Sequence, residues 1–200
     1  VTFEPRFFEL KFGADGGFPA TYAGVAFTGS IDRIDVNAQG EAVIIDYKHK
    51  AAQALSSYAV QKSAVEQNPE GDVPSHEVLP RHVQAIIYAQ VVRTYLKSRN
   101  LTSVGAMYLG THQNYALYGA APESYINKIF GLSDGQKPSK GMLSCVAGDT
   151  VGAFNEYLDA WEDKIKQAVE RMLNGDIHAH ALDKEACAYC PVMNCSERKR

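Results

Sequence analysis

The segment GSIDRIDVNAQGEAVIIDYK, residues 29–48, carries the clearest structural pattern in this chain. β-branched and aromatic residues predict one strand over residues 22–36 and a second over 41–48. Between them, Asn37-Ala38-Gln39-Gly40 has the glycine that tight turns favour, so the two strands are expected to form a hairpin. The triplet Val43-Ile44-Ile45 is apolar on both faces of its strand, which predicts a strand buried in the middle of a sheet.

The rest of the chain alternates between helical and extended patterns. The predicted elements are, in chain order, a helix over 81–100, strands over 103–110 and 115–118, a short helix from Pro122 to about 130, and a long helix over 150–173. Segments rich in proline or glycine, which predict loops, occupy residues 66–80 and 131–149. This order predicts an α/β or α+β domain built on a mixed sheet flanked by helices.

The 200-residue chain has the composition of an ordinary globular protein, with 46% hydrophobic and 22% charged residues. Its net charge of −3 excludes a nucleic-acid binder driven by overall positive charge, although a local basic groove remains compatible with it. No stretch of about 18 apolar residues exists, so neither a membrane span nor a membrane partner is expected. The first residues lack a signal-peptide pattern, which favours a cytoplasmic location, and they lack a methionine, so we expect the chain to be part of a longer protein.

The ends of the two hairpin strands carry the residues with the clearest chemistry. Asp46 and Lys48 follow the apolar triplet two residues apart, so their side chains are expected on the same face of the strand. Asp32, on the neighbouring strand, is expected within reach of that face. Two carboxylates suit Mg²⁺ or Mn²⁺, which keep several waters and bind substrate phosphates. With a lysine beside the metal, such a site has the groups needed to hydrolyse a phosphodiester.

The same residues also have a simpler interpretation. An Asp-x-Lys pattern in a strand is most often an exposed ion pair. A polar side chain directly after a fully apolar triplet is costly unless it is used, which favours a site more than the Asp-x-Lys pattern does alone; on these residues both interpretations stay open. Asp35 lies on the opposite face of a regular strand from Asp32 and is expected to be a solvated partner of Arg33 or another base. The nearby histidines, His49 and His82, are expected to be solvated or core residues rather than ligands.

Three motifs, taken in order, resemble a known family. They are GSIDRID at 29–35, VIIDYK at 43–48, and the spacing of Gln84 and Tyr88 within the predicted helix. Together they resemble the PD-(D/E)xK nucleases of the RecB type. The segment CAYCPVMNC, residues 187–195, is similar to one in the nuclease domain of AddB-type helicase–nuclease subunits and in the related CRISPR adaptation exonucleases.

The resemblance implies a fold and a set of roles. The fold is an α/β, restriction-endonuclease-like core, with residues 1–175 as the nuclease domain and 176–200 as a cysteine-bearing tail. The implied metal ligands are Asp32 and Asp46, the implied catalytic lysine is Lys48, and the helix residues that brace the site or touch the DNA backbone are Gln84 and Tyr88. Glu9 lies in a stretch that looks like the acidic first-helix motif of AddB proteins and would be a further acidic group near the metal.

The cysteines of the C-terminal tail form the second candidate site. Cys187, Cys190 and Cys195 give the pattern C-x₂-C-x₄-C, a density of thiolates that binds Zn²⁺ or an iron–sulfur cluster. The resemblance implies the last three ligands of a 4Fe-4S cluster, although the family usually spaces its last pair one residue wider. The family's first ligand lies far upstream of the nuclease core, so the cluster is expected to be incomplete or absent in this chain. Cys145 is a weaker candidate for the fourth ligand.

The predicted function is a Mg²⁺-dependent deoxyribonuclease domain, exonuclease or endonuclease. By resemblance, it would act on single- and double-stranded DNA ends in a helicase–nuclease complex for recombinational repair of double-strand breaks, with an AddA-like subunit as partner. The sequence has no Walker A motif, so any ATP dependence must come from elsewhere. The alternatives are a catalytically inactive DNA-binding or scaffold module with an iron–sulfur or zinc site, and a cluster or zinc protein whose carboxylates are incidental.

Overall fold

The computed structural model describes residues 2–14, 16–49, 83–112, 117–133, 135–136, 145–146, 148–177, 187–188 and 190–195. The strands are β1 (Glu4–Phe12), β2 (Thr21–Tyr22), β3 (Val25–Ala26), β4 (Gly29–Val36), β5 (Glu41–Lys48), β6 (Thr102–Gly110), β7 (Leu117–Ala121) and β8 (Cys145–Val146). The helices are α2 (Gln84–Lys97), α3 (Glu123–Phe130) and α4 (Val151–Leu173).

The main sheet has six strands in the order β1-β4-β5-β6-β7-β8, and β2 and β3 form a separate small sheet. The pairs β1–β4, β4–β5 and β6–β7 are antiparallel, whereas β5–β6 and β7–β8 are parallel. Two parallel neighbours begin at the same end of the sheet, so the chain must cross back between them. The segment that makes this crossover between β5 and β6 contains α2. The mixed sheet that the sequence predicts is therefore confirmed.

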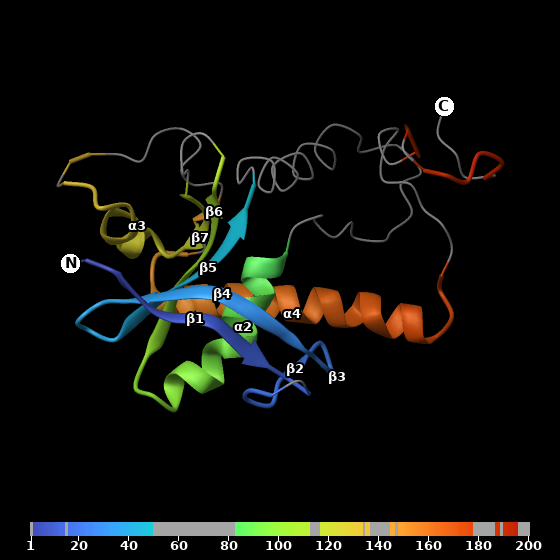
Figure 1. Ribbon diagram of the computed structural model, residues 1–200, viewed down its shortest axis with the longest axis horizontal. Helices are drawn as coiled ribbons and strands as arrows, with labels where there is room; N and C mark the ends of the chain where they lie inside the picture. The colour runs from blue at the N-terminus through green and yellow to red at the C-terminus, as the bar shows by residue number, and fades with distance from the viewer. Residues whose placement is uncertain are drawn as a thin grey trace.

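Helices cover both faces of this sheet. Figure 1 shows α2 and α4 crossing behind the β1 and β4 part of the sheet. One core cluster joins this face to the two helices and includes Ile34, Ile44, Leu96, Phe154 and Leu158. A second cluster lies on the other face, where buried residues of β5 and β6 pack with side chains of α3; its members include Val43, Ile45, Val104, Met107 and Ile129. The molecule is thus an α/β domain with a central mixed sheet flanked by helices.

The predicted hairpin is present, and the triplet at its centre is buried on both faces. Val43 and Ile45 belong to the α3-side cluster, whereas Ile44 belongs to the cluster beneath α2 and α4. In the turn, the Asn37 side-chain oxygen accepts hydrogen bonds from two backbone N–H groups, those of Gln39 and Glu41, at 3.0 Å each. The apolar triplet therefore places β5 inside the sheet, as its sequence predicts.

Several predicted boundaries differ from the structure. The single strand predicted over 22–36 is wrong, because this segment contains part of β2, then β3, and then a separate β4 that starts at Gly29. The predicted loop over 131–149 contains the short strand β8. The long C-terminal helix is confirmed and begins after Thr150, whose Oγ1 accepts the backbone N–H of Ala153 at 3.2 Å. The predicted loop over 66–80 lies outside the described residues.

The stretch around Glu9 was expected to be helical, and this is wrong: it belongs to strand β1. β1 pairs with the outer edge of β4, whose backbone groups would otherwise lack partners in the sheet. Glu9 itself has φ of 48°, in the left-handed region that non-glycine residues rarely adopt. Phe7, Leu10 and Phe12 contact the core beneath α2, and the register shift of β1 against β4 lies between Pro5 and Phe7.

Candidate active site

Asp46 and Lys48 lie at the end of β5, on the face that α2 covers. Asp46 is almost fully buried, with 2% of its surface exposed, and Lys48 is half-buried. The Nζ atom of Lys48 lies 2.5 Å from Oδ2 of Asp46. The two side chains therefore share one face, as the alternation of a strand requires.

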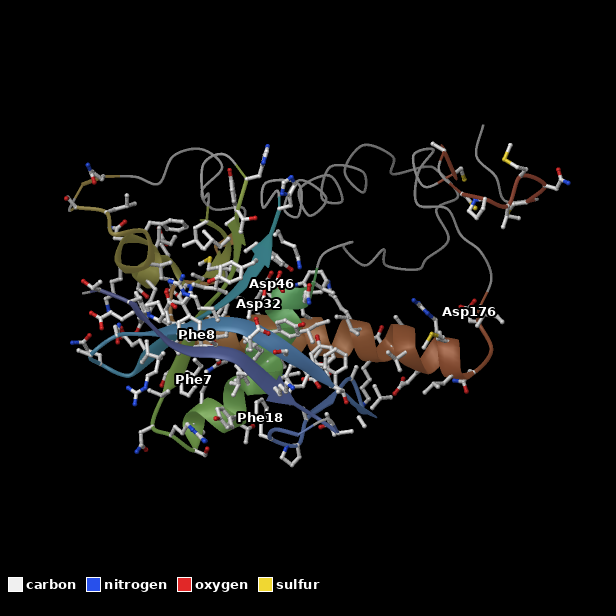
Figure 2. All side chains as sticks on the ribbon, viewed as in Figure 1. Phe7, Phe8, Phe18, Asp32, Asp46 and Asp176 are labelled. Atoms are coloured by element: carbon white, nitrogen blue, oxygen red, sulfur yellow. The ribbon has the colours of Figure 1, made fainter. Side chains whose placement is uncertain are left out.

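Asp32 reaches the same place from β4. The β4–β5 ladder ends at the pair Arg33–Ile45, so the backbone N–H of Tyr47 lies beyond the last strand pair. The Asp32 carboxylate accepts that N–H at 2.8 Å, in place of a backbone carbonyl. Its charge also acts on Asp46, whose pKa it raises. Figure 2 shows the labelled Asp32 and Asp46 next to each other where the hairpin strands meet the start of α2.

The surroundings of the Asp46 carboxyl disfavour its charged form. Burial raises its pKa above the ordinary aspartate value, Asp32 adds to this effect, and Lys48 opposes it. Oδ2 of Asp46 is buried, and the ammonium group of Lys48 lies 2.5 Å from it as its ion-pair partner. A buried carboxylate beside a second carboxylate offers the oxygen ligands that a hard cation such as Mg²⁺ or Mn²⁺ prefers.

We expect Asp46→Asn to raise the free energy of unfolding at neutral pH in EDTA. An aspartate whose folded-state pKa is raised binds its proton more tightly in the folded state, so stability falls as pH rises from the ordinary aspartate pKa through the raised one. The gain should therefore vanish at acidic pH, where both states hold the proton. Thermal unfolding across this pH range measures the effect, and an Asp46→Asn protein less stable than wild type at neutral pH would contradict it.

Asp35→Asn is the matched control, because Asp35 is also buried, with 5% exposed. Its two carboxylate oxygens accept hydrogen bonds from Nε and Nη2 of Arg33. Removing this paired charge should destabilise the protein by about 1–3 kcal/mol, the opposite sign from Asp46→Asn.

Helix α2 contributes two further side chains through its first turns. Lys48 Nζ donates to Oε1 of Gln84 at 2.7 Å, and Nε2 of Gln84 donates to the hydroxyl of Tyr88 at 2.7 Å. Gln84 is the first residue of α2, and Tyr88 lies one turn later on the same helical face. The structure thus brings Asp32, Asp46, Lys48, Gln84 and Tyr88 into one constellation.

Sequence reasoning missed one residue of this constellation, Tyr108 on β6. Tyr108 is paired in register with Asp46 across the parallel strands and is 3% exposed. Its hydroxyl accepts the backbone N–H of Ala85 at 3.1 Å, and its ring centroid lies 5.8 Å from Lys48 Nζ. The sequence feature that could have indicated Tyr108 is its position near the end of the strand that follows α2.

Comparison with known protein families decides the identity of this domain. A sequence model of the PD-(D/E)XK nuclease superfamily matches residues 1–195. The chain belongs to the PD-(D/E)XK nuclease superfamily. No curated protein matches it significantly. The mixed sheet with helices on both faces agrees with the restriction-endonuclease-like fold of a PD-(D/E)XK domain.

Membership of the PD-(D/E)XK superfamily makes this chain a nuclease domain, with DNA as the implied substrate. The match extends past residue 175, where we expect the nuclease domain to end, so this boundary remains a prediction. Among the described helices, none has the length and apolar character needed to cross a membrane.

Glu9, the further acidic group expected near the metal, is placed by the structure on β1, and its role as a ligand stays a prediction. It lies at an exposed position of β1, and its carboxylate accepts a hydrogen bond from Ser30 Oγ at 3.3 Å. Within the described ranges, no three His, Cys, Asp or Glu side chains gather closely enough to hold an ion. Two protein carboxylates leave most positions around a Mg²⁺ ion to water and substrate, as this metal prefers.

Other residues singled out in the sequence lie apart from the constellation. Asp35 pairs with Arg33 as predicted, but it is buried, so its expected solvation is wrong; the Arg33 guanidinium supplies the charge partner that its buried carboxylate needs. His49 is exposed, and its ring contacts that of His112 at a tilt of 40°, with centroids 4.5 Å apart. His82 lies outside the described residues.

The three tail cysteines lie in the described segments 187–188 and 190–195, and their role as cluster ligands stays a prediction. Cys187 is buried, whereas Cys190 and Cys195 are half-buried. The backbone N–H of Cys190 donates to the carbonyl of Cys187 at 3.4 Å. Across the part of the chain that is described, no three His, Cys, Asp or Glu side chains gather closely enough to hold a metal ion, and this includes the three thiols. Cys145 lies on β8, paired with Ala120.

Proposed function

We propose that this PD-(D/E)XK domain is a Mg²⁺- or Mn²⁺-dependent deoxyribonuclease of the RecB and AddB type, hydrolysing phosphodiester bonds in DNA. The observation that carries the proposal is the meeting of Asp32, Asp46 and Lys48 at the ends of β4 and β5, with Lys48 bonded to Gln84. Two carboxylates and a lysine on adjacent strand ends have few purely structural uses, because burying the Asp46 carboxyl is costly: desolvation raises its pKa even with the Lys48 ammonium 2.5 Å away.

The roles divide between the side chains by their chemistry. Asp32 and Asp46 would hold the metal, which when bound acidifies water and offsets the charge that builds on the phosphate. Lys48 would donate to the attacking water or to a phosphate oxygen, since its ammonium has three N–H groups and Gln84 and Asp46 engage two of them. Gln84 in turn is oriented by Tyr88, so the amide presents its oxygen, not its nitrogen, to Lys48.

The proposal is tested by incubating linear single- and double-stranded DNA with the chain in Mg²⁺, in Mn²⁺ and in EDTA. Cleavage that requires the metal and is lost in Lys48→Ala is the expected result. Full metal-dependent cleavage by Lys48→Ala would place the activity elsewhere. DNA binding without cleavage, both alone and with a helicase partner subunit, would instead favour the inactive binding or scaffold module.

We expect Gln84→Ala to lower the cleavage rate about tenfold while leaving DNA affinity unchanged. The substitution frees Lys48 Nζ from the acceptor that fixes its direction, and a misplaced catalytic group lowers the rate rather than the binding. Single-turnover cleavage and a DNA-binding titration in Ca²⁺ measure the two effects.

Gln90→Ala provides the control from the same helix. Gln90 faces α4, where its Nε2 donates to Asp159 at 2.9 Å and to Glu162 at 2.6 Å. Its replacement should therefore affect stability and leave the cleavage rate within about twofold of wild type. Equal losses of rate in Gln84→Ala and Gln90→Ala would assign both effects to a general loosening of α2.

The finer assignment concerns the complex in which the domain acts. The resemblance to AddB-type subunits supports a role in recombinational repair of double-strand breaks, beside an AddA-like helicase–nuclease subunit. It also supports a 4Fe-4S cluster on Cys187, Cys190 and Cys195 in the complete protein. Iron and labile-sulfide analysis of anaerobically purified protein tests this assignment. A Cys190→Ser variant should lose the iron, and a full complement of zinc in place of iron would overturn the assignment.

A further inference from the structure

Helix α2 begins without a cap from its own sequence. Its N-cap residue is Val83, which has no side-chain acceptor to offer, and its first turn contains no acidic residue. The first backbone N–H groups of a helix have no partner within the helix and must find one elsewhere. Here the partner comes from the sheet: the Tyr108 hydroxyl accepts the N–H of Ala85 at 3.1 Å and also interacts with that of Gln84.

The same tyrosine borders the strand end that carries Asp46 and Lys48. Tyr108 lies beside Asp46 in the parallel β5–β6 register. The ammonium group of Lys48 lies 5.8 Å from the centroid of the Tyr108 ring, within range of a cation–π interaction. The buried Tyr108 side chain therefore contacts both Lys48 at the end of β5 and Ala85 at the start of α2.

We propose that Tyr108 is a positioning residue that holds the start of α2 on the sheet and thereby sets Gln84 against Lys48. Gln84 is the first residue of the helix, where fraying begins when a cap is lost. The kinetic part of this inference rests on the proposed nuclease function, whereas the structural part does not. Burial raises the pKa of Tyr108 to about 12, so the phenol remains neutral in the working range and the cap is independent of pH.

The structural test is Tyr108→Phe, which keeps the ring and removes only the hydroxyl. Amide hydrogen exchange at Ala85 should become about five- to tenfold faster, the scale of a lost helix cap. Tyr22→Phe is the matched control, because Tyr22 is 2% exposed and its buried hydroxyl has no hydrogen-bond partner among the described residues. It should leave exchange at Ala85 unchanged. Unchanged exchange at Ala85 in a folded Tyr108→Phe protein would overturn the proposal, whether or not the protein cleaves DNA.

The kinetic test combines Tyr108→Phe with Gln84→Ala. Tyr108→Phe alone should lower kcat on the order of fivefold with KM unchanged, since DNA binding does not depend on the cap. If Tyr108 acts through Gln84, the double variant should be no slower than Gln84→Ala alone. Rate losses that multiply in the double variant would show an independent effect and overturn the positioning role. A wild-type chain that never cleaves DNA would refute the proposed function, while the exchange measurement would still decide the role of Tyr108.

Discussion

Lys48→Ala should lower DNA cleavage by on the order of 10²–10³ while leaving DNA binding nearly intact. Lys48 is half-buried and held from two sides, by the Asp46 carboxylate at 2.5 Å and by the Gln84 amide oxygen at 2.7 Å. A side chain fixed in this way is preorganised for charge that develops during the reaction. A contact made mainly in the transition state lowers the rate when it is lost, and not the affinity for substrate.

The measurement is single-turnover cleavage in Mg²⁺ together with a DNA-binding titration in Ca²⁺. Lys97→Ala is the matched control, because Lys97 is exposed in the last turn of α2, away from the constellation. Lys48→Arg should restore little activity, since a planar guanidinium does not replace a compact ammonium between two acceptors. Cleavage by Lys48→Ala within about threefold of wild type would refute the catalytic role, and an equal loss of DNA affinity would make Lys48 a binding residue.

Asp32→Ala and Asp46→Ala should each weaken binding of divalent metal by more than about a hundredfold. Losing a residue that only supports a metal ligand costs about 10–100-fold, and losing a ligand itself should cost more. The two carboxylates lie on neighbouring strands, and Asp32 raises the pKa of Asp46, so one ion placed between them depends on both. Either substitution halves the protein charge available to that ion. Activity should fall with the metal affinity, because both substitutions remove the same site.

Calorimetric titration with Mn²⁺ measures this affinity directly. Asp159→Ala serves as control, since Asp159 is a carboxylate paired with Arg93 on the far side of α2 from the hairpin. It should bind Mn²⁺ as the wild type does. Unchanged affinity in Asp32→Ala, with loss in Asp46→Ala, would show that the metal does not lie between the two aspartates.

Much of the candidate site could be predicted from local sequence, because strand alternation alone decides which side chains share a face. The spacing of Asp46 and Lys48 after the triplet Val43–Ile45 required them to lie together at the end of a buried strand, and they do. The Gln84 to Tyr88 spacing required both side chains on one face of a helix, and the two are bonded. These relations hold whatever the rest of the chain does.

Only the tertiary structure decided the features that depend on contacts between distant segments. Glu9 lies on a strand and not a helix, because the free edge of β4, about twenty residues later, offers its backbone partners. The burial of Asp46 and the exposed position of Glu9 follow from which elements cover them. Tyr108 meets Ala85 because β6 pairs in parallel with β5 beneath α2, a register that no local pattern specifies. Alternation along a strand is a property of the backbone, whereas the pairing of strands and the caps of helices depend on the whole fold.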